Sequence, residues 1–336
     1  MTFSLWRRLR GLRSKLGALA ALPGEFERRM SELQTQVVAL RHDMADETQR
    51  RAKEHVASTE QTLVLRQQLA AVLARSRPSA GEQLERGLAY RQGLNAIGVL
   101  NYENDVVSGE RRFLACFGKS HPAAVVLDVG GNEGQYARLV RQLVPQAVIH
   151  SFEPSPVSFP KLAQTAREID ASAHQLALGD ASTDIEFFDY ADEAGSQHAS
   201  VYREVIEGVH KRPASSTKVP CRTLDEFAKQ AGIGRIGLLK IDTEGHEMAV
   251  LRGARQLLGA GAIDVVQFEF NEMNVISRVF MKDFFDVLGN YRLYRLLQDE
   301  ALELAQYDPR MMEIFAYQNI AAIRRDLDPG WIHGNA

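Results

Sequence analysis

The chain has 336 residues, of which 45% are hydrophobic and 25% charged, and its 40 basic and 43 acidic side chains give a formal net charge of −3. This composition excludes collagen-like, wholly disordered and multispanning membrane proteins. The longest uncharged apolar run, Leu16–Pro23, is much shorter than the roughly 20 residues that cross a bilayer. Two cysteines, Cys116 and Cys221, are too few for a disulfide framework, so we expect a reducing, cytoplasmic location.

The charge is distributed unevenly along the chain. Residues 1–80 carry 14 basic and 8 acidic side chains, a balance of +6, whereas the rest carries 26 and 35, a balance of −9. Phosphate contacts require a basic surface, which the acidic part lacks. The sequence therefore predicts a basic N-terminal arm followed by an acidic globular domain, with no nucleic-acid partner.

Residues 1–24 form a basic amphipathic segment. Five basic side chains lie between Arg7 and Lys15, no acidic residue occurs before Glu25, and leucines supply an apolar stripe. Such a helix can lie at the surface of an anionic membrane, with Trp6 at headgroup depth. We therefore keep two alternatives for residues 1–22: peripheral contact with the inner face of the membrane, or a basic tail that docks on the acidic domain.

Residues 25–80 are predicted to form a helical coiled-coil arm, because no Gly or Pro occurs in the 53 residues from Glu25 to Arg77. Apolar residues repeat there at the 3,4 spacing of a coiled-coil seam, at Met30, Leu33, Val37, Leu40 and Met44. A lone helix of about 80 Å could not bury this seam. We therefore expect a homo-oligomer formed through the arm, with packing of the arm on its own domain as the alternative.

Residues 81–120 are predicted to be a helical lead-in, and from residue 121 short apolar runs alternate with helical stretches. The predicted strands are Val125–Val129, Val148–Phe152, Ala173–Leu178, Ile185–Tyr190, Ile236–Ile241 and Val265–Phe270. The predicted helices among them are Tyr136–Leu143, Ser158–Asp170, Leu224–Ala231 and Met248–Ala260. This alternation is typical of an α/β fold with a parallel sheet, which binds ligands beyond the carboxyl ends of its strands.

A glycine-rich turn, Asp128–Gly134, follows the first predicted strand and directly precedes a helix. Glycines in this position let the backbone approach a ligand. The turn matches neither the phosphate-binding loop of nucleotide triphosphatases nor the dinucleotide fingerprint, which disfavours a nicotinamide oxidoreductase. Glu153, at the end of the second strand, suits the ribose hydroxyls of a nucleoside.

A second polar cluster follows the strand Ile236–Ile241. It contains Asp242, Glu244, His246 and Glu247, and gathering four ionisable side chains is costly unless they bind or react. Glu269 and Asn271 follow the next strand and are expected at the same edge of the sheet. Asp242, Glu269 and Asn271 could also hold a divalent ion, an alternative to a site without metal.

Six motifs in this order resemble the FkbM-type S-adenosylmethionine-dependent methyltransferases. They are DVGGNEG, FEP, ALGD, VPCRTLDEF, KIDTEGHE and LRGA, within a resemblance that runs from about Ser108 to Arg324. The resemblance implies a Rossmann-like class I methyltransferase fold with a seven-stranded sheet and helices on both faces, preceded here by the coiled coil. It assigns residues 121–326 to the methyltransferase domain and leaves residues 327–336 as a tail.

The resemblance also implies roles for individual residues. The expected S-adenosyl-L-methionine contacts are Asp128, Gly130, Asn132 and Gly134 at the methionine part, Glu153 and Pro154 at the ribose, Ala177, Leu178 and Asp180 at the adenine, and Asp242 at the sulfonium. The expected catalytic residues are Asp242 and Glu244, with His246 ranked behind them. The expected acceptor contacts are Glu247, Glu269 and Asn271, and no metal is included.

The function expected from these features is O-methyl transfer to a hydroxyl, of a sugar in a surface glycan or of a secondary metabolite. The alternative is a catalytically degenerate scaffold that acts through its coiled coil. The complete glycine-rich turn, Glu153 and the Asp242–Glu247 cluster favour the enzyme.

The coiled-coil hypothesis makes the first testable prediction. Replacing Leu33 and Leu40 with Asp places charge in the seam and should convert a homo-oligomer into a monomer that still binds S-adenosylmethionine. Sedimentation of the double variant beside the wild type measures this. A wild type that is already monomeric at tens of micromolar would contradict self-association.

Overall fold

The computed structural model describes residues 80–192, 195 and 198–334, together with helical stretches at 28–29, 31–33, 35–40, 63–64 and 66–67. The chain divides into two units, Met1–Glu85 and Arg86–Ala336. The expected amphipathic segment 1–24 and most of the expected coiled-coil arm lie outside the described residues, so both stay predictions. Within the described part of the chain, no helix is long and apolar enough to span a membrane.

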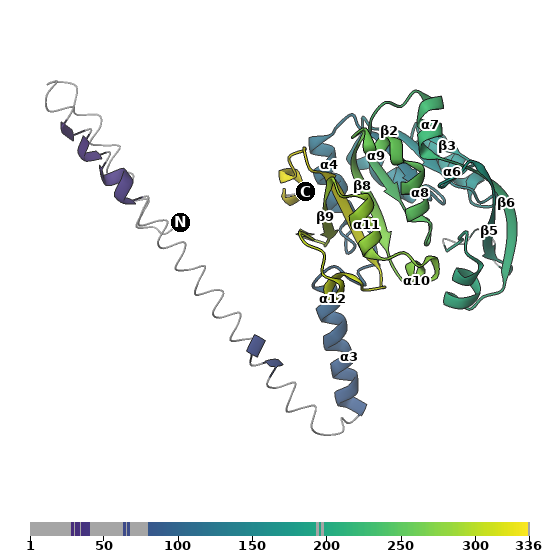
Figure 1. The fold of residues 1–336 in the computed structure, drawn as a ribbon, viewed down its shortest axis with the longest axis horizontal. Helices are drawn as coiled ribbons and strands as arrows, with labels where there is room; N and C mark the ends of the chain where they lie inside the picture. Colours follow the sequence, from purple (N-terminus) through teal and green to yellow (C-terminus); the bar gives the residue numbers. More distant parts are fainter. Residues whose placement is uncertain are drawn as a thin grey trace. The chain divides into compact units, whose positions relative to one another are not determined.

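A central sheet of eight strands organises the second unit (Figure 1), in the order β10-β9-β11-β8-β7-β1-β2-β3. The strands are β1 (Val125–Val129), β2 (Val148–Phe152), β3 (Ser172–His174), β7 (Ile236–Ile241), β8 (Ile263–Phe270), β9 (Tyr291–Leu296), β10 (Ala301–Glu303) and β11 (Gln318–Arg324). Five neighbouring strands are parallel, namely β3, β2, β1, β7 and β8. The other three, β11, β9 and β10, each pair antiparallel with their neighbours. The expected count of seven is corrected to eight, because the short β10 pairs with the edge strand β9.

A second sheet of three strands, in the order β4-β6-β5, lies in Figure 1 on the same side of the unit as β3. Its strands are β4 (Ala177–Leu178), β5 (Thr183–Tyr190) and β6 (Ala214–Arg222). The expected strand Ala173–Leu178 is therefore wrong as one element. The pairing of β3 with β2 ends at His174, and Ala177 then pairs with Cys221 of β6.

Helices cover both faces of the central sheet, as expected. One apolar core joins the sheet to α4 (Glu110–Ser120) and α5 (Gln135–Leu143). The other joins it to α7 (Leu224–Ala231), α8 (Glu247–Gly253) and α11 (Met281–Val287). The remaining helices are α3 (Ala80–Asn95), α6 (Phe159–Glu168), α9 (Arg255–Gly259), α10 (Met273–Ser277), α12 (Pro309–Met312) and the short η1 (Val205–Val209) and η2 (Gly330–His333).

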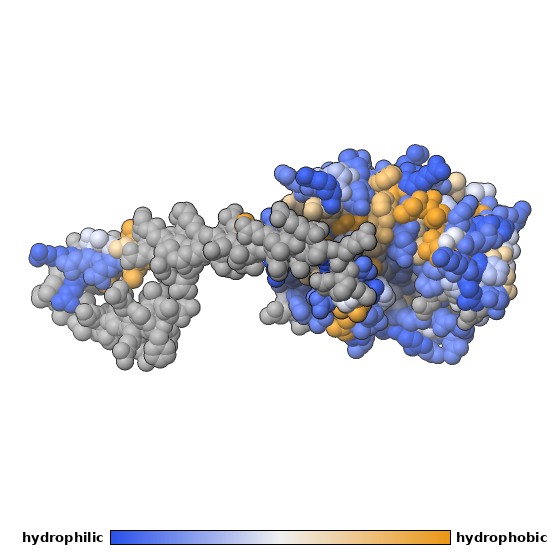
Figure 2. Space-filling model, turned by 90° about the horizontal axis from the view of Figure 1, so that it is seen from below, coloured by the Kyte–Doolittle hydropathy of each residue, from blue (hydrophilic) through white to orange (hydrophobic). Residues whose placement is uncertain are grey.

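Local sequence explains these helices. In α5 the buried residues recur at helical spacing, at Tyr136, Ala137, Leu139 and Val140, whereas Arg138, Arg141 and Gln142 are polar. The expected helix Met248–Ala260 is divided at Ala254 into α8 and α9. Figure 2 shows hydrophilic residues over much of the visible surface of this unit, with hydrophobic residues in separate patches.

Residues 327–334, expected to be a tail outside the domain, instead pack against α4. The ring of Trp331 lies 5.9 Å from that of Phe113, and Ile332 is fully buried. Arg112 of α4 donates hydrogen bonds to the carbonyls of Ile332 (3.0 Å) and Gly334 (2.9 Å). This segment therefore belongs to the folded domain, because it covers an apolar surface that α4 leaves open.

Truncating this buried contact should destabilise the domain. Ile332→Ala leaves a cavity against α4, and we expect a loss of about 3 kcal/mol in the free energy of unfolding. Leu302→Ala, at a side chain that is 40% exposed, is the matched control and should cost less than about 1 kcal/mol. Urea unfolding of both variants measures the difference, and equal losses would contradict the assignment of this segment to the core.

Candidate functional site

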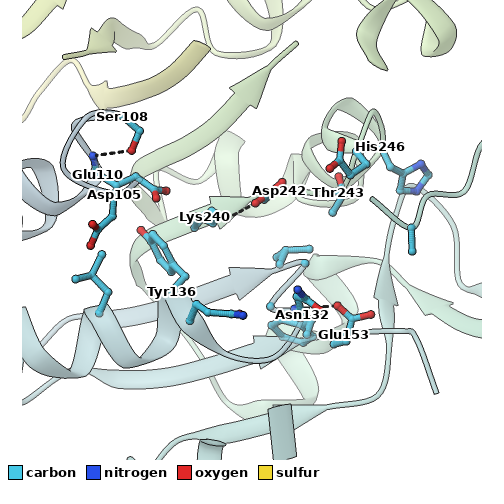
Figure 3. Close-up of a pocket in the computed structure, with 18 of the residues that line it drawn as sticks. Asp105, Ser108, Glu110, Asn132, Tyr136, Glu153, Lys240, Asp242, Thr243 and His246 are labelled. Atoms are coloured by element: carbon cyan, nitrogen blue, oxygen red, sulfur yellow. Dashed lines mark hydrogen bonds and ion pairs between the residues drawn. The ribbon is translucent and has the colours of Figure 1, made fainter. Parts of the chain in front are cut away.

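A cavity of about 740 Å³ opens beyond the carboxyl ends of β1, β2 and β7. Its volume lies within the range of small-molecule sites. Figure 3 shows Lys240 and Asp242 near its centre, with Asn132 and Glu153 on one side and Asp105, Ser108 and Glu110 on the other. The cavity therefore has two halves that meet at Asp242.

The glycine-rich turn brings the end of β1 against the end of β7. Gly130 has a φ of 85°, and a Cβ atom there would lie 1.7 Å from the carbonyl oxygen of Asp242. The amides of Gly130 and Gly131 both donate to the carbonyl of Phe152, at 3.0 and 2.8 Å. Only glycine fits at position 130, and the turn places Gly130, Gly131 and Asn132 in the cavity wall.

Glu153 lines the same half of the cavity, although only 6% of it is exposed. Its carboxylate accepts hydrogen bonds from the amides of Asn132 (2.9 Å) and Ser155 (2.8 Å). Burial raises its pKa to about 7, against the opposing effect of these two hydrogen bonds. Each oxygen has a second lone pair, so a bound ligand can still donate hydroxyl hydrogen bonds to it.

Two of the expected cofactor residues lie behind the cavity wall. Asp128 is fully buried and accepts a hydrogen bond from the hydroxyl of Ser151 at 3.0 Å, while its Oδ1 has no partner. Burial raises the pKa of Asp128 to about 6, although Lys240 lowers it. Gly134 begins α5 and faces Thr165 of α6. Both residues support the turn without lining the cavity.

The expected adenine residues divide into two groups. Ala177 and Leu178 line the cavity together with Phe187 of β5, and Pro154 lies beside them in the wall. Asp180 is exposed and lines a separate cavity near α8 and α9. The second sheet therefore supplies an apolar surface to the site, and Asp180, two residues beyond β4, does not line it.

Lys240 and Asp242 form an ion pair below the centre of the cavity. The Nζ of Lys240 lies 2.7 Å from Oδ2 of Asp242 and 4.9 Å from the centre of the Tyr136 ring, and the lysine side chain is 5% exposed. Burial alone would lower the pKa of Lys240, but the carboxylates around it, Asp242 and Glu110 foremost, raise it above its ordinary value. The lysine therefore stays charged and fixes the orientation of Asp242.

Glu244 lies in the left-handed region, with a φ of 51°. Its Oε1 is 3.2 Å from Nδ1 of His198, and its Oε2 is buried without a partner. Burial raises the pKa of Glu244 to about 7, and the contact with His198 opposes this rise. Glu244 lines the cavity, so a carboxyl that titrates near neutral pH is available there.

His246 also lines the cavity, but on the side of β4. A Cβ atom on Gly179, directly after β4, would lie 2.9 Å from its Nε2. Figure 3 places His246 away from Lys240 and Asp242. Burial lowers its pKa to about 4, so the ring is neutral at physiological pH.

The three expected acceptor contacts are absent from the described residues that line the cavity. Glu247 accepts hydrogen bonds at 3.0 Å from the amide and hydroxyl of Thr243 and from the amide of Gly245, so it holds the turn after β7. Asn271 accepts from the amide of Met273 at the start of α10. The pKa of Glu269 is raised well above its ordinary value, by burial and by Asp242.

Within the described part of the chain, no group of three or more His, Cys, Asp or Glu side chains is arranged to hold a metal ion. Asp242 and Glu269, two members of the alternative metal set, belong to no such group among the described residues. Asn271 is engaged in its turn, and Asp242 is engaged by Lys240.

The structure adds one wall that the motifs did not indicate. Residues 102–111 line the half of the cavity beyond Asp242, with Tyr102, Asp105, Ser108 and Glu110 among them. Gln267 of β8 donates a hydrogen bond to Glu110 at 2.7 Å, which ties this wall to the sheet. The available signal was the triplet Ser108–Glu110, where the family resemblance begins.

Comparison with known proteins identifies the domain. Residues 128–296, half of the chain, match the family model described as the methyltransferase FkbM domain. The chain belongs to this family. The family predicted from the six motifs is confirmed, and residues 128–296 form a methyltransferase domain of the FkbM type.

Three curated relatives of the FkbM domain are similar over parts of their length. Methyltransferase 1 of Beauveria bassiana is 31% identical over 142 residues, which cover 38% of this chain and 57% of that protein. The 2-O-methyltransferase NoeI of Sinorhizobium fredii is 29% identical, over 41% of this chain and 60% of that protein. The 31-O-demethyl-FK506 methyltransferase FkbM of Streptomyces tacrolimicus is 28% identical, over 39% and 60%. The chain thus covers less than two thirds of each relative.

The cavity residues fit the cofactor of the FkbM domain. A nucleoside needs a carboxylate for its ribose and apolar side chains for its base, and Glu153, Ala177 and Leu178 supply these. The Oδ1 of Asn132 is buried without a partner, which leaves an acceptor free for a ligand. The cofactor has no phosphate, so it requires no basic cradle.

The buried Asp128 predicts a pH-dependent stability. The pKa of Asp128 is about 6 in the folded state and 3.8 ordinarily. The free energy of unfolding of the wild type therefore falls as the pH rises from about 4 to 6, because the unfolded chain ionises this group more easily. Asp128→Asn removes this cost, and its stability relative to the wild type should grow by about 1.4 kcal/mol between pH 5 and pH 8. Urea unfolding at both pH values tests this, and an advantage that shrinks as the pH rises would contradict it.

Proposed function

We propose that the protein transfers a methyl group from S-adenosylmethionine to a hydroxyl of a sugar, in a surface glycan or a related secondary metabolite. One observation carries the proposal: a single cavity joins Asn132 and Glu153, which are expected to contact the methyl donor, to the carboxylates of Asp242 and Glu244. The names of two relatives, a 2-O-methyltransferase and a 31-O-demethyl-FK506 methyltransferase, denote methylation at oxygen and support a hydroxyl acceptor.

The donor half of the cavity would hold the cofactor by polar and apolar contacts. Glu153 would accept the ribose hydroxyls, Asn132 would bind near the methionine part, and Ala177 with Leu178 would enclose the base. The cofactor supplies a methyl group that is already activated by a positive sulfonium. The acidic lining around Asp242 favours such a charge and requires no metal or phosphate-binding loop.

The chain then has to align the acceptor hydroxyl and remove its proton. Asp242 is the residue we propose for this role, because it lies where the two halves of the cavity meet and Lys240 fixes its carboxylate. Glu244 is the second candidate, since its enclosed Oε2 has no partner and its pKa is about 7. His246 ranks third, because it lies at the β4 side.

Three isosteric variants test the proposal. Asp242→Asn keeps the size of the side chain but cannot accept a proton, so methyl transfer should fall at least ~10²-fold. Glu244→Gln and His246→Gln are the matched comparisons and should retain more activity. The measurement is transfer of labelled methyl from S-adenosylmethionine to a panel of glycosides, with cofactor affinity determined by calorimetry.

The pH profile distinguishes the two carboxyl groups. If Glu244 removes the proton, the wild-type rate rises with pH through about 7, because the Glu244 carboxyl must be ionised to accept a proton. In that case Glu244→Gln abolishes methyl transfer. That result, with Asp242→Asn still active, would overturn the assignment of the base. Failure of the wild type to bind S-adenosylmethionine would overturn the proposed function itself.

A further inference from the structure

The wall of residues 102–111 lies outside the part of the chain that matches the FkbM domain, yet it lines the same cavity. It is held in place by the sheet and its own turns. The amide of Leu100 donates to the carbonyl of Tyr317, just before β11, at 2.8 Å, and Gly109 packs so closely on Leu297 that a Cβ would lie 2.4 Å from its oxygen. This wall is therefore built into the domain.

The cations that line the cavity are all engaged by carboxylates. Among the described lining residues these cations are Arg111, Arg138 and Lys240. Arg111 pairs with Asp105 at 2.7 Å, Lys240 pairs with Asp242 at 2.7 Å, and Arg138 pairs with Glu168. In the half of the cavity lined by residues 102–111, a ligand with a phosphate, sulfate or carboxylate group would have to compete with Asp105 for Arg111.

The same lining is rich in carboxyl groups. They are Glu103, Asp105, Glu110, Glu153, Asp242 and Glu244. Hydroxyl groups can donate to such oxygens, and charge-assisted hydrogen bonds of this kind are stronger than neutral ones. An anion placed beside Glu103, Asp105 and Glu110 would lose hydration and meet like charges, which is costly in an enclosed site.

An aromatic surface completes the wall. Tyr102 is 57% exposed, and its ring lies 6.1 Å from that of Tyr317 in an edge-to-face arrangement. Both tyrosines line the cavity, near Ser108. A flat ring next to carboxylates and hydroxyls suits a ligand with one apolar face and several hydroxyl groups.

We propose that residues 102–111 select the acceptor, admitting an uncharged, hydroxyl-bearing ring and rejecting anionic ones. This inference rests on the proposed function and deepens it. Its selectivity comes from the Arg111–Asp105 pair, which engages the cation of this wall, and its affinity comes from the Tyr102 surface.

Two probes that differ at a single carbon test the selectivity. Methyl glucoside and methyl glucuronide share a ring but differ by a carboxylate, and their binding to the full chain loaded with S-adenosylhomocysteine can be followed by ligand-observed NMR. The wild type should bind the glucoside at least about tenfold more tightly. Asp105→Asn releases Arg111 and should improve binding of the glucuronide about tenfold.

A matched control separates local from general charge effects. Asp286→Asn releases Lys282 of α11, outside this cavity, and should leave the ratio between the probes unchanged. Tyr102→Ala, at an exposed side chain, should weaken the glucoside at least about fivefold and leave the cofactor affinity unchanged. This second variant keeps the test available if Asp105→Asn does not fold.

The outcomes are distinguishable. Equal or tighter binding of the glucuronide to the wild type overturns the inference. So does a failure of the glucoside to bind at millimolar concentration, or a glucoside affinity that Tyr102→Ala does not change. Calorimetry with S-adenosylhomocysteine is carried out first. If that ligand does not bind, the proposed function and this inference both fail; if it binds and the glucuronide is preferred, only the inference fails.

Discussion

One buried ammonium group allows the carboxylates of this site to coexist. Lys240 is 4% exposed, and its charge acts on four acidic groups that would otherwise repel one another in a region of low dielectric. These groups are Asp242, Glu110, Asp128 and Glu269. They come from the turn after β7, from α4, from β1 and from β8, so the end of the sheet, the cavity floor and the wall before the FkbM domain all depend on one side chain. A buried pair that loses one partner is strongly destabilising, which makes Lys240 an element of both fold and site.

The elements at the centre of the sheet could be predicted to the residue. Val125–Val129, Val148–Phe152 and Ile236–Ile241 are short apolar runs because helices cover both of their faces, and a continuous run needs no tertiary information. β6 was not predicted, because it has no continuous apolar run. Its residues Ala214–Arg222 are mostly exposed and polar, and their pairing with β5 and β4 makes them a strand.

For the site, the sequence identifies loops but not the direction of each side chain. Asp128 and Asp242 both occur near the carboxyl ends of central strands. Asp128 is still part of β1, where it pairs in register with Lys240. Asp242 lies one residue beyond β7 and lines the cavity. Glu247 belongs to the same motif, but three donors of its own turn occupy it. The wall at Tyr102 was missed because its contribution arises from tertiary packing and carries no local pattern.

The contact between Gly130 and the carbonyl of Asp242 has a consequence for the gene. Every glycine codon has the form GGN, and each single-base change that alters the amino acid introduces a side chain or a stop. At position 130 the first carbon of any side chain would collide with backbone, whereas at Gly131 it would lie 3.1 Å from Oδ2 of Asp128, a contact that can relax. The two adjacent glycine codons can undergo the same changes, but selection should act on them differently. We expect every missense change at codon 130 to be removed, whereas codon 131 can change to alanine.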